Sequence, residues 1–199
     1  DNSFTNKIIA CNIDFAVIVA SFKEPMFHPR FVDRYIMILE NSKIPYIIVL
    51  NKSDLKTKKE EELLKTYKDI GIKVIETSTY DKTGISELKE MLKEKQAIFV
   101  GNSGVGKSSL TSLITGNDNV KINSVGGKTK RGRHTTTKST YYMWNHNSSI
   151  IDTPGIRSLN LSQLKKEEIK YYFSEFKDLN NKCKYKDCIH FKRSKKWLK

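Results

Sequence analysis

The stretch Gly101-Asn-Ser-Gly-Val-Gly-Lys-Ser-Ser109 decides the fold, because it matches in full the glycine-rich loop that holds nucleotide phosphates. Glycines let backbone N–H groups turn inward around phosphate oxygens, since a Cβ would obstruct that approach. An ordinary glycine-rich turn is the alternative, but an apolar run before the loop and a helical pattern at 107–115 favour the phosphate loop. Lys107 would bind the β- and γ-phosphates, and Ser108 would offer a hydroxyl to Mg²⁺. The nucleotide contacts expected here are Gly101, Asn102, Ser103, Gly104, Val105, Gly106, Lys107, Ser108 and Ser109.

A second motif, Asn51-Lys52-Ser53-Asp54, lies upstream at the end of an apolar run and is typical of guanine recognition. The Asp54 carboxylate can accept hydrogen bonds from the ring N–H and the exocyclic amine of guanine, a donor pair that adenine lacks. Such a site rejects the wrong base by roughly 10⁴-fold, because the buried carboxylate would be left unpaired. The aliphatic stem of Lys52 can lie along the purine ring. A helix-capping aspartate is the alternative for this short motif.

Two more segments complete the set of nucleotide motifs. Ser78 follows the next apolar run, where GTPases keep a small residue whose backbone N–H serves guanine O6. Asp152-Thr-Pro-Gly155 matches the Asp-x-x-Gly of P-loop NTPases, so Asp152 would hold the Mg²⁺ shell and the Gly155 amide would sense the γ-phosphate. A plain Thr-Pro-Gly turn is the alternative, but it leaves the acid unexplained. In an ordinary GTPase the phosphate loop precedes the guanine motif, so the reversed order here indicates a circularly permuted GTPase.

The segment Gly132-Arg-His-Thr-Thr-Thr137 lies between the phosphate loop and Asp152, where the first switch of a GTPase belongs. Thr135 or Thr136 can ligate Mg²⁺ when the γ-phosphate is present, although a hydroxyl-rich edge strand is the alternative. Ile156 stands where many GTPases carry a water-orienting Gln, and an aliphatic side chain cannot orient water. We therefore expect slow intrinsic hydrolysis, with His134 or a group from a partner orienting the water.

Apolar runs alternate with helical patterns, which predicts a three-layer α/β P-loop GTPase domain with a parallel sheet. We expect this domain to span residues 1–158, and residues 159–199 to form a small helical, Cys/His-bearing appendage. The expected strands are 14–20, 46–51, 73–78, 97–101, 141–144 and 148–152. The expected helices lie around 31–39, 60–67, 85–92, 107–115 and 158–180.

The net charge of +14 is concentrated in two short segments. Residues 121–138 hold six Lys or Arg and no acid, and residues 182–199 hold eight and one acid, so the rest of the chain is nearly neutral. This distribution indicates a nucleic-acid binder, with a lysine-rich solvated surface as the alternative. The apolar runs are too short to cross a bilayer.

Three cysteines are too few for a disulfide scaffold and favour a reducing, cytoplasmic compartment. Cys11 borders an apolar run and is expected to be buried. The run Cys183-x4-Cys188-x-His190 has ligand types and spacing compatible with Zn²⁺, and two free thiols in a basic tail are the alternative.

Together these motifs resemble the circularly permuted GTPases of small ribosomal subunit maturation, over nearly the whole chain. The resemblance lies in Gly101–Leu110, in Gly132–Thr137 and in the Cys183–His190 run. It implies binding of GTP and GDP, Mg²⁺, rRNA and the small (30S) subunit, by a monomer that does not bind membranes. The family also has an N-terminal OB-type barrel, which we do not expect within these 199 residues. It has a fourth zinc ligand where this chain has Lys196, so the zinc site is expected to be incomplete.

Other functions remain open from the sequence. A permuted GTPase of large-subunit assembly shares the motif order but typically lacks the Cys/His tail. A P-loop kinase would transfer phosphate to a small acceptor but would have no use for Asn51–Asp54. An RNA-binding module with a degenerate nucleotide site would not need Lys107, Asp54 and Asp152 intact.

The water-orienting role is tested by His134→Ala. With the physiological partner present, we expect this variant to release phosphate from GTP more slowly than the parent. Equal rates would rule out the histidine and leave the role to the partner.

Overall fold

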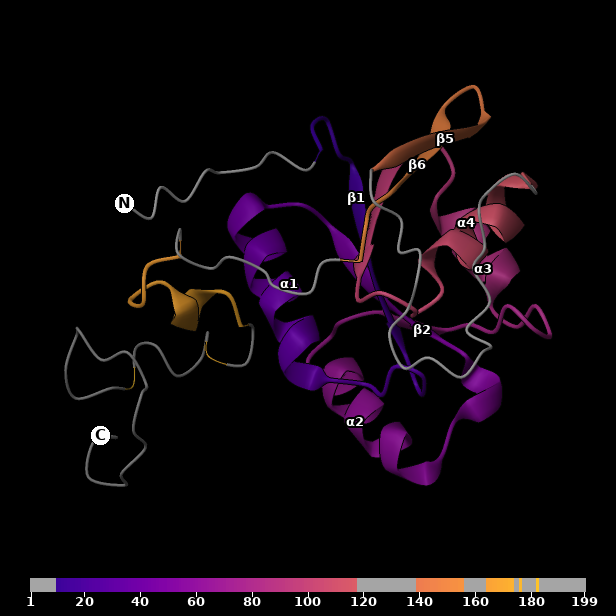
Figure 1. Ribbon diagram of the computed structural model, residues 1–199. Helices are drawn as coiled ribbons and strands as arrows, with labels where there is room; N and C mark the ends of the chain where they lie inside the picture. Colours follow the sequence, from indigo (N-terminus) through magenta and orange to yellow (C-terminus); the bar gives the residue numbers. More distant parts are fainter. Residues whose placement is uncertain (1–9, 118–138, 156–163, 174–175, 177–181, 183–199) are drawn as a thin grey trace, which may run out of the picture.

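A computed structural model describes residues 10–117, 139–155, 164–173, 176 and 182. Within these residues the chain forms one six-stranded sheet with the strand order β3-β2-β1-β4-β6-β5 (Figure 1). The strands are β1 (Phe15–Ser21), β2 (Tyr46–Asn51), β3 (Val74–Glu76), β4 (Gln96–Gly101), β5 (Thr140–Asn145) and β6 (Ser148–Asp152). Each expected strand is therefore present, with ends that differ by at most two residues from those predicted.

Five strands of the sheet run parallel, and β5 pairs antiparallel with β6 at the edge. The central strand β1 is buried along its whole length, because it lies between β2 and β4 and is covered on both faces. Its continuous apolar sequence, Phe-Ala-Val-Ile-Val-Ala, is the pattern that such a position requires.

Helices cover both faces of the sheet and form the outer layers. The first pair, α1 (Pro29–Ser42) and α2 (Lys58–Asp69), packs on one face, and α3 (Ile85–Met91) and α4 (Lys107–Thr115) pack on the other (Figure 1). Two apolar clusters fill the spaces between the layers. Phe99 and Leu110 belong to the cluster under α3 and α4, and Ile18 and Leu64 belong to the cluster under α1 and α2. The predicted three-layer α/β architecture is confirmed.

The topology fixes where a ligand can bind. The chain leaves β1 toward β2 on one side and leaves β4 toward β5 and β6 on the other, so the connections diverge at the carboxyl ends of β1 and β4. Open α/β sheets bind ligands in the crevice at this divergence. The glycine-rich loop between β4 and α4 lies at that point.

Two expectations about local structure are wrong. Cys11 is exposed, because it precedes β1 and stays outside the layers. Of the helix expected at 158–180, the described residues 164–173 contain only a short 3-10 helix, Ile169–Tyr171. The hydroxyl of Tyr172 donates to Asn41 Oδ1 at the end of α1 (2.8 Å), a contact between distant segments that a periodic pattern does not encode.

The expected domain division between residues 158 and 159 falls outside the described residues, so it stays a prediction. Among the helices of the described residues, none has the length and apolar character that a bilayer crossing requires.

Candidate functional site

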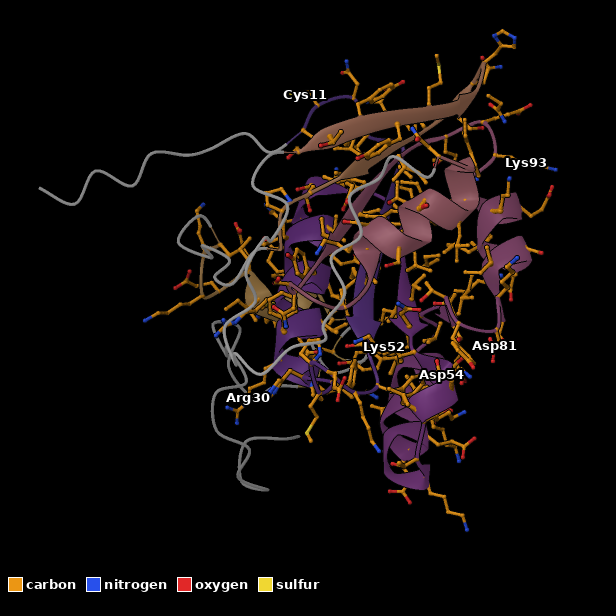
Figure 2. The ribbon with its side chains drawn as sticks, turned by 45° about the vertical axis from the view of Figure 1, so that its right-hand side comes forward. Cys11, Arg30, Lys52, Asp54, Asp81 and Lys93 are labelled. Carbon is orange, nitrogen blue, oxygen red and sulfur yellow. The ribbon has the colours of Figure 1, made fainter. Side chains whose placement is uncertain are left out.

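The sequence motifs converge at the carboxyl ends of the parallel strands. Asn51, Gly101 and Asp152 are the last residues of β2, β4 and β6, and Ser78 follows β3 by two residues. Because these strands are parallel, their carboxyl ends meet at the same edge. Figure 2 shows Lys52 and Asp54 at this end of the molecule, far from Cys11.

Lys107 is enclosed by the glycine-rich loop that precedes it. Its ammonium Nζ donates to the carbonyls of Gly101 (3.1 Å) and Asn102 (2.9 Å), and the residue is only 6% exposed. Burial lowers the pKa of Lys107 to about 8, although the nearby Asp152 carboxylate opposes this shift. The positive charge is thus held at the N-terminus of α4, where an anion is favoured.

Asn51 joins the guanine-type motif to the glycine-rich loop. Its Nδ2 donates to the carbonyl of Val105 (2.9 Å), and its Oδ1 accepts a hydrogen bond from Thr77 (3.3 Å). Gly106 makes this contact possible: its φ is +99°, and a Cβ there would lie 2.1 Å from Asn51 Nδ2. The buried Asn51 side chain is therefore engaged within the protein and holds two distant motifs together.

Asp54 and Ser78 form a second pair across 24 residues of sequence. The hydroxyl of Ser78 donates to Asp54 Oδ1 (2.8 Å) and accepts hydrogen bonds from the backbone N–H groups of Tyr80 (3.2 Å) and Asp81 (3.4 Å). The backbone N–H of Ser78, which was expected to serve guanine O6, donates to the carbonyl of Thr83 (3.1 Å) in this structure. Ser78 is buried, whereas Asp54 is exposed. The carboxylate is thus oriented by a fixed hydroxyl and remains accessible from solvent.

Lys52, two residues before Asp54, contacts a different segment of the chain. Its ammonium donates to the backbone carbonyl of Glu24, in the loop between β1 and α1. Partial burial lowers the pKa of Lys52, and the charges of Glu24 and Asp54 oppose this effect.

Asp152 and Ser108 provide a polar pair suited to a divalent cation. Ser108 Oγ donates to Asp152 Oδ2 (2.6 Å), while the buried Oδ1 of Asp152 has no hydrogen-bond partner among the described residues. Burial raises the pKa of Asp152, and the Ser108 hydrogen bond and the Lys107 charge oppose this shift. The Asp152 carboxylate and the Ser108 hydroxyl therefore provide the kind of oxygen ligands that Mg²⁺ prefers.

The Asp152–Gly155 segment is fixed against the glycine-rich loop. Thr153 Oγ1 donates to the carbonyl of Phe99 in β4 (2.6 Å). A Cβ on Gly155 would lie 2.5 Å from the backbone N and Cα of Ser103, so glycine is required for this close approach. The two motifs that the sequence assigns to the γ-phosphate are therefore in contact.

Several predicted residues lie outside the described ones, and their roles stay predictions. No group of three or more His, Cys, Asp or Glu that could hold a metal occurs within the described residues. The undescribed candidates are His134, Thr135, Thr136, Cys183, Cys188 and His190.

A cavity of about 230 Å³ lies elsewhere, between α1 and α2, and contains none of the motif residues. Sequence reasoning missed Ser21 and Glu24, which lie at the edge of the site. One signal for Ser21 was present, namely a hydroxyl at the end of an otherwise apolar strand.

The fold and the site define a P-loop nucleotide-binding protein whose motifs run in permuted order. The model of the family described as RsgA GTPase matches residues 1–162, and the chain belongs to this family. This match favours the leading resemblance over the large-subunit group.

The chain is 38% identical to the small ribosomal subunit biogenesis GTPase RsgA of Chlorobaculum parvum, over 92% of this chain and 60% of that protein. The crystal structure of YjeQ from Thermotoga maritima matches with a TM-score of 0.72 and 30% identity, over 92% of this chain and 62% of that one. The structure of YloQ, described as a circularly permuted GTPase, matches with a TM-score of 0.68 and 28% identity, over 93% of this chain and 59% of that one. The chain thus spans about three fifths of the length of these relatives.

Removal of the Asn51 amide tests whether its hydrogen bond to Val105 stabilises the contact between the two motifs. Asn51→Ala leaves the buried Val105 carbonyl without its donor, and we expect a loss of about 1–3 kcal/mol in the free energy of unfolding, measured by urea denaturation. Thr77→Val is the matched control, because it removes only the longer bond to the same side chain and should cost less. Equal losses of unfolding free energy in the two variants would contradict a stabilising role of the Asn51–Val105 hydrogen bond.

Proposed function

We propose that this chain binds GTP, hydrolyses it to GDP and phosphate, and acts in the maturation of the small ribosomal subunit. The observation that carries the proposal is the Asn51–Val105 hydrogen bond, which joins a guanine-type motif and a phosphate loop into one site. A GTP molecule would need both motifs at once, whereas an ATP-dependent kinase would use only the phosphate loop.

The residues divide into a base end and a phosphate end. At the base end, Asp54 accepts from guanine, Ser78 orients that carboxylate, and Lys52 lies along the ring. At the phosphate end, the N–H groups of the loop and the Lys107 ammonium bind the phosphates, with the N-terminus of α4 behind them.

Mg²⁺ fits the remaining polar pair. Ser108 and Asp152 would hold it, since Asp152 Oδ1 is buried and has no hydrogen-bond partner among the described residues. When bound, this cation neutralises negative charge on the β- and γ-phosphates. The Gly155 amide would sense the γ-phosphate, and the close approach of this glycine to Ser103 in the loop supports that role.

Partners follow from the relatives and from the charge distribution. Relatives with this domain are named small ribosomal subunit biogenesis GTPases, and the basic segments 121–138 and 182–199 suit rRNA. We propose a cytoplasmic, ribosome-associated protein in which Cys183, Cys188 and His190 hold Zn²⁺ beside the RNA-binding tail. Because the aliphatic side chain of Ile156 cannot orient water, we also propose that hydrolysis is slow when the small subunit is absent.

Phosphate release from GTP, measured with and without small ribosomal subunits, tests the proposal. We expect slow hydrolysis by the chain alone, strong stimulation by small subunits, and no stimulation by large subunits. ATP should compete poorly, and Asp54→Ala should reduce GTP affinity while leaving the affinity for inorganic triphosphate unchanged. Equal hydrolysis of ATP, or no effect of small subunits, would refute the proposal.

The buried lysine predicts a pH dependence of nucleotide binding. In the free protein the pKa of Lys107 is about 8, and bound phosphates should raise it, since they favour the charged form. Below pH 8 the ammonium is already formed and affinity should be flat, whereas above pH 8 binding requires proton uptake and affinity should fall by up to about tenfold per pH unit.

Calorimetry at pH 8.5 in buffers of different ionisation enthalpy measures the protons taken up. Lys107→Arg is the control, because a guanidinium stays charged over this range. The titration of guanine itself is common to both proteins. Equal proton uptake by both would contradict the assignment to Lys107.

A further inference from the structure

The loop between β1 and α1, residues 22–28, lies between the two halves of the nucleotide site. At its start, the backbone N–H of Phe22 donates to the carbonyl of Asn51 (3.2 Å). The buried hydroxyl of Ser21, the last residue of β1, donates to the carbonyl of Pro25 (2.7 Å) and so holds the loop turned back on its own strand. The loop is therefore fixed to β1 and to the end of β2.

The same loop lies against the phosphate loop. A Cβ added to Gly104 would lie 3.6 Å from Pro25 Cδ and 4.0 Å from the Glu24 carbonyl, which is ordinary contact distance. The space that Pro25, Asn102 and Val105 help to line is about 10 Å³, room for no more than one water molecule. The Glu24 carbonyl thus lies between the phosphate loop and the guanine motif.

This carbonyl receives the ammonium of Lys52. Partial burial disfavours the charge on that ammonium, so a fixed acceptor is needed to keep the side chain in place. Without an acceptor the ammonium would turn to water, and the stem of a lysine has several rotatable bonds.

We propose that residues 22–28 form a third wall of the nucleotide site and that Ser21 is a positioning residue for the base. Ser21 fixes the loop, the Glu24 carbonyl anchors Lys52, and the anchored stem of Lys52 is preorganised along the purine. The inference rests on the proposed binding of guanine nucleotides and extends it to residues that the nucleotide motifs do not include. Preorganisation of one long side chain contributes about two- to tenfold in affinity.

Binding of a fluorescent GDP analogue to Ser21→Ala, Lys52→Ala and the double variant tests the route from Ser21 to the base. We expect Ser21→Ala to weaken GDP about two- to tenfold in the parent and to have no further effect when Lys52 is already alanine. Inorganic triphosphate, which lacks a base, should bind Ser21→Ala as tightly as the parent. Ser148→Ala is the matched control, because Ser148 is also a buried strand serine with one hydrogen bond to the backbone (Glu94 N–H, 2.8 Å) but lies at the opposite end of the sheet.

A merely structural role of Ser21 would weaken GDP equally with and without Lys52, or would weaken inorganic triphosphate as well, and either result overturns the proposal. If Ser21→Ala fails to fold, Lys52→Met replaces it, since methionine keeps an aliphatic stem but cannot donate to Glu24. That variant should lose about two- to tenfold in GDP affinity, and parental affinity would overturn the inference. A parent that binds no GDP would refute the proposed function, and this inference with it. Parental affinity in Ser21→Ala would refute the inference alone.

Discussion

The buried amide of Asn51 is the constraint on which the rest of the site depends. It joins the end of β2 to the phosphate loop that follows β4, two segments separated by 54 residues, with β1 between them in the sheet. Both of its polar atoms are engaged, so the loop carbonyl of Val105 and the hydroxyl of Thr77 are fixed relative to one another. The Asn51 amide also requires glycine at position 106, because any Cβ there would displace this amide. Within the protein, Asn51 therefore holds the guanine-type motif and the phosphate loop in fixed relative positions.

The second theme is charge held away from water. Lys107 and Asp152 are both nearly inaccessible to solvent. Burial lowers the pKa of Lys107 and raises the pKa of Asp152, so in each case it favours the neutral form. An arrangement of this kind costs stability unless partners compensate, and here an oxygen of Asp152 has no hydrogen-bond partner among the described residues. Natural proteins keep such costs mainly at functional sites, where a ligand offsets them. The phosphates and a divalent cation are the charges that would complement this pair.

Chain order matters little to this site because the sheet determines where the motifs meet. All the motif-bearing strands are parallel, so their carboxyl ends share an edge whichever strand comes first in sequence. A permutation that keeps the strand order β3-β2-β1-β4-β6 therefore keeps the site, while it changes which segments follow it. The Asp152–Gly155 segment, packed on Ser103, here leads directly toward the C-terminal residues.

Sequence alone determined the strands, the four helices of the two outer layers and the positions of the phosphate and guanine motifs, because these follow from local periodicity and short motifs. Tertiary structure decided what joins them: the Asn51–Val105 bond, the Ser78–Asp54 pair and the contact of Lys52 with Glu24 link residues 24 to 54 positions apart. Local patterns carry no information about such pairs. The same reason explains the two errors, since the exposure of Cys11 and the short 3-10 helix at Ile169–Tyr171 depend on what the rest of the chain places beside them.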